Sequence, residues 1–138
     1  MSPAEASSRA PVAVVSLFDD FDFALLDSRD FKEDAVREEI VHPLLKALGY
    51  AASGPHRIIR SKSLEHPFLT TGSQRRPITL IPDYLLTVNG NFTCVLDAKA
   101  PQENIKTGHH VEQVYSYAIH PEIRVELFAL CNGREFVV

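Results

Sequence analysis

The sequence has only two cysteines, no excess of positive charge and no long apolar run. Cys94 and Cys131 cannot build a disulfide framework or a zinc site, so both are expected to be reduced residues of an apolar core. A membrane-spanning helix needs about 20 consecutive apolar residues, and the N-terminus lacks the basic-then-apolar pattern of a secretion signal. These absences predict a cytoplasmic protein without a membrane partner.

Charge and histidine patterns exclude two further classes of protein. The 14 Lys and Arg against 18 Asp and Glu leave a net charge of −4, which argues against a free-standing electrostatic nucleic-acid binder. Residues 57–76 form the one basic stretch of the sequence, and a solvated strand and loop is an ordinary explanation for it. His109 and His110 are adjacent and point to different sides of a helix, and the other histidines lack ligand spacing, so no zinc site is predicted.

Length and composition predict one folded domain. A chain of 138 residues with 45% apolar residues can bury a core, but it has no room for a second full domain. Residues 1–11 are small, polar and proline-containing, so they are expected to form a disordered arm before a domain at 12–138. Because the chain ends in sheet-forming sequence, the domain could be the N-terminal part of a longer protein.

Apolar periodicity predicts a helix over Phe31–Leu48, where apolar residues recur every three or four positions. Gly49 should end this helix, and Pro43 should kink it near Glu39 because proline cannot donate a backbone hydrogen bond. The rest of the chain is predicted as a strand within 56–63, a loop over 64–77, two strands over 80–98, a helix in the second half of 102–120, and strands at 125–131 and from 135. This order indicates an α/β fold with a mixed central sheet flanked by helices, in the order αβββαβ.

The stretch Ile81–Pro101 predicts a β-hairpin that carries the polar residues of interest. Two apolar strands flank Asn89-Gly90-Asn91, residues that tolerate positive φ. A hairpin centred on Gly90 sets Asp83 opposite Asp97, and the strand period of two puts Lys99 on the same face as Asp97. An unpaired carboxylate between buried strands would cost several kcal/mol, so this cluster needs a bound cation or protonation.

Two carboxylates and a lysine at one end of a buried sheet suit metal-dependent cleavage of phosphodiesters. Carboxylates hold Mg²⁺, which polarises the phosphate and lowers the pKa of a bound water, while the lysine orients that water or stabilises developing charge. A salt-bridged sheet end is the structural alternative. Asp-x-Lys on a strand is more often a surface ion pair, so only the combined pattern is specific.

The sequence resembles the PD-(D/E)XK nuclease superfamily, and more narrowly the N-terminal nuclease domain of type I restriction enzyme R subunits. The resemblance covers roughly residues 31–138. It is carried by the helix KEDAVREEIVHPLLKALGY, the strands IPDYLL and LDAKAP, the helix EQVYSYA and the strand-turn FALCNGREF. It implies Mg²⁺-dependent cleavage of double-stranded DNA, with Mn²⁺ as a substitute, beside a translocase motor and specificity and methylation subunits. The chain has no GxxxxGK[ST] phosphate loop, so it carries no ATP site and the motor would lie elsewhere.

The resemblance also implies roles for individual residues. Asp83, Asp97 and the carbonyl of Ala98 match the metal ligands, and Lys99 matches the catalytic lysine. Glu33 matches an acid on the first helix, although Asp30-x-x-Glu33 also reads as a capping box and Glu33 with Arg37 as an ordinary helix pair; Glu38 and Glu65 are the substitutes. Gln113 and Tyr117 match a glutamine and tyrosine that contact DNA, with a surface amide and a core tyrosine as the alternative. A nuclease-like fold that binds DNA or assembles with partners without cleavage remains the competing function.

Overall fold

The computed structural model describes residues 17–60, 64–71, 74–80 and 82–138, with the side chains of 17–60 and 82–138. The predicted arm at residues 1–11 lies outside this part. The described elements, in chain order, are η1 Phe23–Asp27, α1 Glu33–Val36, η2 Arg37–Val41, α2 His42–Ala47, β1 His56–Arg60, β2 Leu64–Thr71, β3 Gln74–Leu80, β4 Tyr84–Val88, β5 Asn91–Ala98, α3 His109–Ala118, β6 Leu127–Cys131 and β7 Phe136–Val137.

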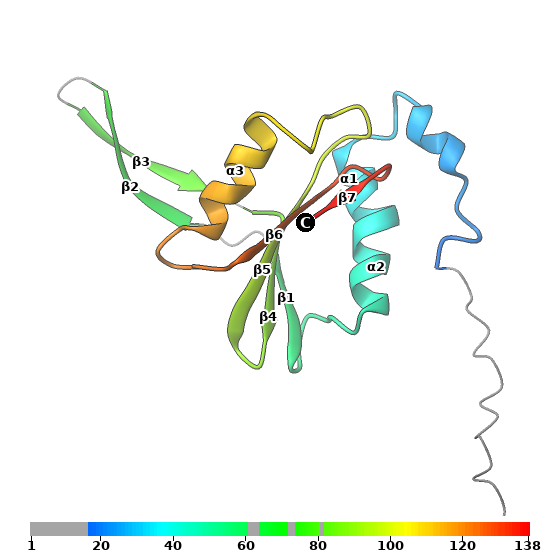
Figure 1. Cartoon of the computed structure of the whole chain (residues 1–138), viewed down its shortest axis with the longest axis horizontal. Helices are drawn as coiled ribbons and strands as arrows, with labels where there is room; N and C mark the ends of the chain where they lie inside the picture. The colour runs from blue at the N-terminus through cyan, green and yellow to red at the C-terminus, as the bar shows by residue number, and fades with distance from the viewer. Residues whose placement is uncertain (1–16, 61–63, 72–73, 81) are drawn as a thin grey trace, which may run out of the picture.

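A five-stranded mixed sheet forms the centre of the fold, with strand order β1-β4-β5-β6-β7. Only β5 and β6 pair in parallel, because α3 lies between them in the chain and carries it back across the sheet. The other three pairs are antiparallel. Figure 1 shows α3 on one side of the sheet and α1 with α2 on the other. The predicted mixed α/β class is therefore confirmed.

The predicted helix over 31–48 is present, with an irregular centre. α1 and α2 are joined by a π-helical turn, η2, in which the N–H of His42 donates to the carbonyl of Arg37. Pro43 follows directly and has no N–H to donate, so the regular bond to Glu39 cannot form. Gly49, with φ of +94°, ends the helix as expected.

The β4–β5 hairpin has a tighter turn than predicted and contains a β-bulge. Asn89 and Gly90, with φ of +50° and +83°, form a two-residue turn, so Asn91 already belongs to β5. Val88 therefore pairs with Asn91, whereas beyond the turn Leu86 pairs with Cys94, and Thr93 is the extra residue. The Thr93 hydroxyl donates to the Leu86 carbonyl at 3.1 Å. This bulge restores the predicted register in which Tyr84 faces Leu96, one step from Asp83 and Asp97.

The loop predicted over 64–77 is wrong, because β2 and β3 pair there as a separate two-stranded antiparallel sheet. The proline, serine and glycine content suggested a loop, but Phe68, Leu69, Thr70 and Thr71 favour a strand. The register of the pair shifts between His66 and Leu69, around Pro67, which has no N–H for the ladder.

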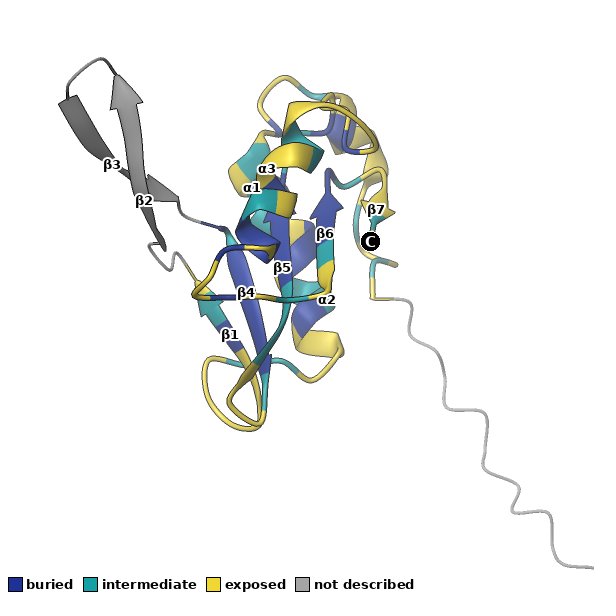
Figure 2. Cartoon of the chain, turned by 60° about the vertical axis from the view of Figure 1, so that its left-hand side comes forward, coloured by how far each residue is buried: buried dark blue, intermediate teal, exposed yellow. Residues whose placement is uncertain are grey.

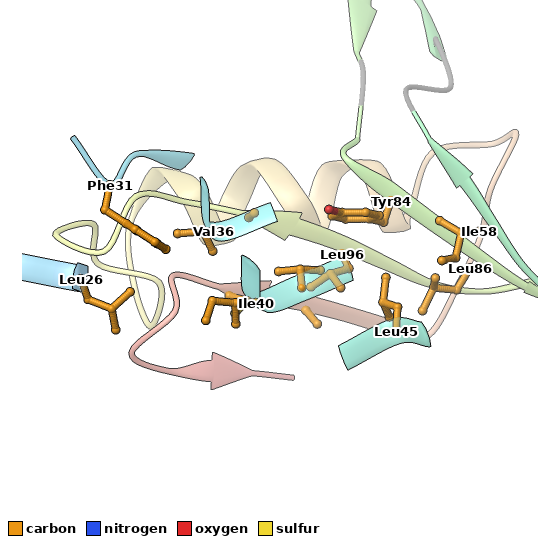
Figure 3. Packing of buried hydrophobic residues seen from close by; sticks show 13 residues of the cluster. Leu26, Phe31, Val36, Ile40, Leu45, Ile58, Tyr84, Leu86 and Leu96 are labelled. Carbon is orange, nitrogen blue, oxygen red and sulfur yellow. The ribbon is translucent and has the colours of Figure 1, made fainter. Parts of the chain in front are cut away.

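Both faces of the central sheet are buried, as its apolar strands predict. Tyr84, Leu86 and Leu96 face the first helices, where they pack with Val36, Ile40 and Leu45 (Figure 3). The alternate residues Leu85 and Val95 face α3 and pack with Val114 and Tyr117. Figure 2 shows β4 and the second half of β5 as buried between these layers. Asp97 shares the parity of Val95, so it belongs to the α3 face, whereas Asp83 and Lys99 lie just outside β4 and β5 at the end of the sheet.

The two cysteines pack as predicted, and both are free thiols. Cys131 is buried in the core, and Cys94 is partly buried against it. Burial raises the pKa of Cys94 to about 11, so this thiol is poorly reactive. Among the described residues, no helix combines the length and apolar character that crossing a bilayer requires.

Candidate functional site

Asp83 and Asp97 meet where β4 begins and β5 ends. Asp83 directly precedes β4, and Asp97 is the penultimate residue of β5. The N–H of Asp83 donates to Oδ1 of Asp97 at 2.8 Å, and the N–H of Ala98 donates to Oδ2 of Asp83, also at 2.8 Å. Each strand end thus holds a carboxylate of the other through a backbone hydrogen bond, which places the two acids side by side.

Burial and neighbouring charges disfavour the ionised form of the Asp97 carboxyl group. Asp97 is only 3% exposed. Burial raises the pKa of Asp97 to about 7, and the charges of Asp83 and Glu33 act in the same direction, although the Asp83 N–H and Lys99 oppose them. The protonated, neutral form of Asp97 is therefore favoured relative to that of an exposed aspartate. Of the two outcomes that the sequence allowed for a buried carboxylate, the raised pKa favours protonation, and binding of a cation stays a prediction.

Arg37, at the start of η2, reaches Asp83 from the first helix. Its Nη1 lies 3.0 Å from Oδ1 of Asp83 and 3.9 Å from Oε2 of Glu33. Burial alone would lower the pKa of Arg37, but the charge of Asp83 and their hydrogen bond outweigh it, so the pKa is raised and the guanidinium stays charged. The pair with Asp83 spans 46 positions in the sequence and joins the first helix to the sheet end.

Lys99 lies beside the carboxylates with its ammonium held by two other side chains. Its Nζ is 3.7 Å from Oε1 of Glu33 and donates to Oε1 of Gln113 at 3.3 Å. The lysine side chain is 13% exposed, so its charge is mostly removed from solvent. Glu33 therefore bridges the two cations of the cluster, since it faces Arg37 through one oxygen and Lys99 through the other.

Tyr117 is a core residue that also lies near the carboxylates, and its contact with DNA stays a prediction. It is 3% exposed and packs in the apolar layer under α3, which is the core position of the structural alternative. Burial raises the pKa of Tyr117 to about 12, and the charges of Asp97, Asp83 and Glu33 contribute. All three carboxylates thus disfavour ionisation of the phenol. Gln113, one turn earlier on α3, is exposed and free to meet a ligand from solvent.

Six of the side chains singled out from the sequence lie together in the structure, and Arg37 joins them. We call this group the Asp83–Asp97 cluster; its members are Glu33, Arg37, Asp83, Asp97, Lys99, Gln113 and Tyr117. Ala98 joins it through its N–H. Of the three helix acids considered, Glu33 is the one that reaches Lys99, Glu38 is exposed, and the side chain of Glu65 falls outside the described part. Arg37 was missed as a site residue, because its spacing from Glu33 had suggested only a helix pair.

The donor set of this cluster fits a hard divalent cation bound by few protein ligands. Within the described side chains, no group of three or more His, Cys, Asp or Glu lies close enough together to hold a metal ion. Mg²⁺ commonly uses one or two carboxylates and takes its remaining ligands from water and substrate phosphate. Asp83 and Asp97 supply two carboxylates side by side, and burial, followed by the charge of Asp83, raises the pKa of Asp97.

Comparisons with family models, with curated proteins and with solved structures find no match to this chain.

Proposed function

We propose that this chain is a Mg²⁺-dependent DNA endonuclease domain with a restriction-endonuclease-like fold, acting in the cytoplasm as the nuclease module of a restriction system of the type I R-subunit kind. The observation that carries the proposal is the pair of backbone hydrogen bonds, from the Asp83 N–H to Asp97 and from the Ala98 N–H to Asp83, that holds the two carboxylates side by side at the sheet end. Lys99 lies beside them and pairs with Glu33. A translocase motor and the specificity and methylation subunits would be supplied by other sequence.

Each residue of the cluster has a distinct role in this proposal. Asp83 and Asp97 would hold the cation, which when bound would polarise a DNA phosphate and acidify a water. The ammonium of Lys99, positioned by Glu33 and Gln113, would orient the attacking water or stabilise the charge that develops on phosphate. Gln113 is exposed and Tyr117 lies beneath it, so the amide would make the first contact with DNA.

A plasmid cleavage assay with Mg²⁺ or Mn²⁺ tests the proposal directly. We expect the wild type to nick or linearise plasmid DNA and Lys99→Ala to lose at least about 100-fold in rate, because a positioned charge acting on the reacting group is removed. Lys106→Ala is the matched control, since Lys106 is an exposed lysine paired with Glu135 outside the cluster. Equal rates for the wild type and Lys99→Ala would reject the assignment of Lys99.

A second function, a nuclease-like fold that binds DNA or assembles without cleaving, is favoured by one observation. Arg37 and Lys99 already pair with Asp83 and Glu33, so much of the cluster charge is balanced internally. Calorimetric titration with MgCl₂ separates the two functions even if cleavage requires a motor. Metal binding that Asp83→Asn abolishes supports the nuclease, whereas DNA binding without metal binding supports the silent module.

A further inference from the structure

Arg37 is anchored at two points on consecutive residues at the start of β4. Its guanidinium contacts Asp83 at 3.0 Å, and its backbone carbonyl accepts a hydrogen bond from the Tyr84 hydroxyl at 3.4 Å. The same carbonyl receives the N–H of His42 that closes the π-helical turn η2. A π-turn shifts the residues after it around the helix axis, and such turns are frequent at functional sites. These hydrogen bonds hold both the backbone carbonyl and the guanidinium of Arg37 in place.

The Arg37 guanidinium and a backbone N–H contact different oxygens of Asp83. Oδ2 of Asp83 accepts the N–H of Ala98, and Oδ1 of Asp97 accepts the N–H of Asp83. Arg37 contacts Oδ1 of Asp83. A divalent cation that binds Asp83 therefore meets a fixed charge of the same sign at this oxygen, and like charges a few ångströms apart in a partly buried site repel strongly.

Glu33 offers Arg37 a second anion close by. Its Oε2 is 3.9 Å from the same nitrogen, Nη1, that contacts Asp83. The guanidinium can leave Asp83 and still remain paired, because the other oxygen of Glu33 is the one that faces Lys99. Arg37 is therefore the cation that is already paired with Asp83, and Glu33 is a second anion with which it can pair.

We propose that Arg37 is a positioning residue that serves as the internal counter-cation of Asp83, and that a divalent cation binds the cluster by displacing Arg37 from Asp83 towards Glu33. This inference rests on the proposed metal site. Arg37 would keep the carboxylates in place before the metal arrives, and it would weaken metal binding by competing for Asp83. The metal affinity of this domain would thus be set partly by an arginine that is not itself a ligand.

Calorimetric titration of the purified chain with MgCl₂ and with MnCl₂ at pH 8 tests the inference. We expect Arg37→Gln to lower the dissociation constant roughly two- to fivefold, the range for removing a partly exposed competing charge. Arg37→Lys should stay near the wild-type value, because it keeps the charge. Arg57→Gln is the control for net charge, since Arg57 is an exposed arginine that contacts the carbonyl of Ala52. It lies near the start of β1 and pairs with Thr87, at the opposite end of β4 from Asp83.

A second readout follows the metal-free protein. Without metal, Arg37→Gln should melt at a lower temperature than the wild type, and added MgCl₂ should raise its melting temperature by more than that of the wild type. If Arg37→Gln does not fold, Arg37→Met keeps the alkyl stem and carries the same expectation.

The possible outcomes separate the two proposals. Unchanged or weaker metal binding by a folded, uncharged Arg37 variant would overturn the counter-cation role while leaving the nuclease proposal intact. Tighter binding by Arg37→Lys as well would also overturn it, because charge would not be the cause. An absence of metal binding in the wild type and in every Arg37 variant would instead reject the metal site and therefore the proposed function.

Discussion

The N–H of Asp83 donates a hydrogen bond to the carboxylate of Asp97 at 2.8 Å. This bond ties the start of β4 to the end of β5 and brings together two acids that are 14 positions apart in the sequence. The arrangement stabilises an ionised Asp97, but burial and the neighbouring charge of Asp83 act against it more strongly. A proton on Asp97 therefore relieves the repulsion, and the proposed metal ion would do the same; both effects can be measured.

Asp97 should make the stability of the metal-free protein depend on pH. Because its pKa rises from 3.8 unfolded to about 7 folded, its stabilising contribution is complete below pH 3.8 and is lost as the pH rises through about 7. Asp97→Asn keeps an acceptor for the Asp83 N–H without this penalty. We expect the variant to exceed the wild type in unfolding free energy at pH 8, by at most on the order of 4 kcal/mol, and by much less at pH 4. Urea unfolding in EDTA measures this, and an equal difference at both pH values would contradict the shift.

Divalent metal should raise the melting temperature of the wild type, because a ligand that binds only the folded state stabilises it. Asp83→Asn should abolish the increase, since the variant removes one of the two carboxylates that would hold the cation. Glu126→Gln removes an exposed acidic charge just before β6 and should leave the increase unchanged. Thermal melts with and without MgCl₂ test this, and a wild-type melting temperature that ignores saturating metal would argue against a metal site.

Gln113→Ala should reduce cleavage or DNA binding at little cost in stability. The amide is exposed and its oxygen accepts a hydrogen bond from the Lys99 ammonium at 3.3 Å, so its loss should cost less than about 1 kcal/mol of unfolding free energy. We expect activity to fall because Lys99 loses one of the groups that position it. Plasmid cleavage and DNA-binding titration measure the loss of function, and thermal melting measures the cost in stability. Unchanged cleavage and DNA binding would contradict this role of Gln113.

Tyr117→Phe separates the two roles of Tyr117. The change keeps the ring in the apolar layer under α3 and removes only the hydroxyl near the three carboxylates. Lower activity with an unchanged melting temperature would support a role in the site. Normal activity would restrict Tyr117 to the core and leave Asp83, Asp97 and Lys99 as the essential group.

Gly133→Ala should destabilise the fold more than Gly54→Ala. Both glycines have positive φ, +84° and +94°, so alanine is strained at either position by about 1 kcal/mol. A Cβ at Gly133 would lie 2.9 Å from Cδ2 of Leu26, whereas at Gly54 it would meet nothing within 4 Å. The difference in unfolding free energy between the two variants measures the clash with Leu26, and equal losses would show that Leu26 moves aside freely.

Several features of this protein followed from the sequence alone because they depend on neighbouring residues. The three- and four-residue spacing of Val36, Ile40 and Leu44 predicts a helix, and the apolar strands around Asn89-Gly90 predict a hairpin. The period of two along β5 places Asp97 and Lys99 on one face without reference to the rest of the fold. The resemblance of the motifs then suggested which polar residues belong together.

Tertiary structure decided what local pattern could not. After a two-residue turn, Asp83 can face Asp97 only because of the bulge at Thr93. A threonine at that position does not by itself predict a bulge. The contact of Arg37 with Asp83 spans 46 positions and depends on how the first helix packs against the sheet. The spacing of Glu33 and Arg37 describes a helix face, but only packing determines whether that face meets solvent or a carboxylate, because charges act through distance in space and not along the chain.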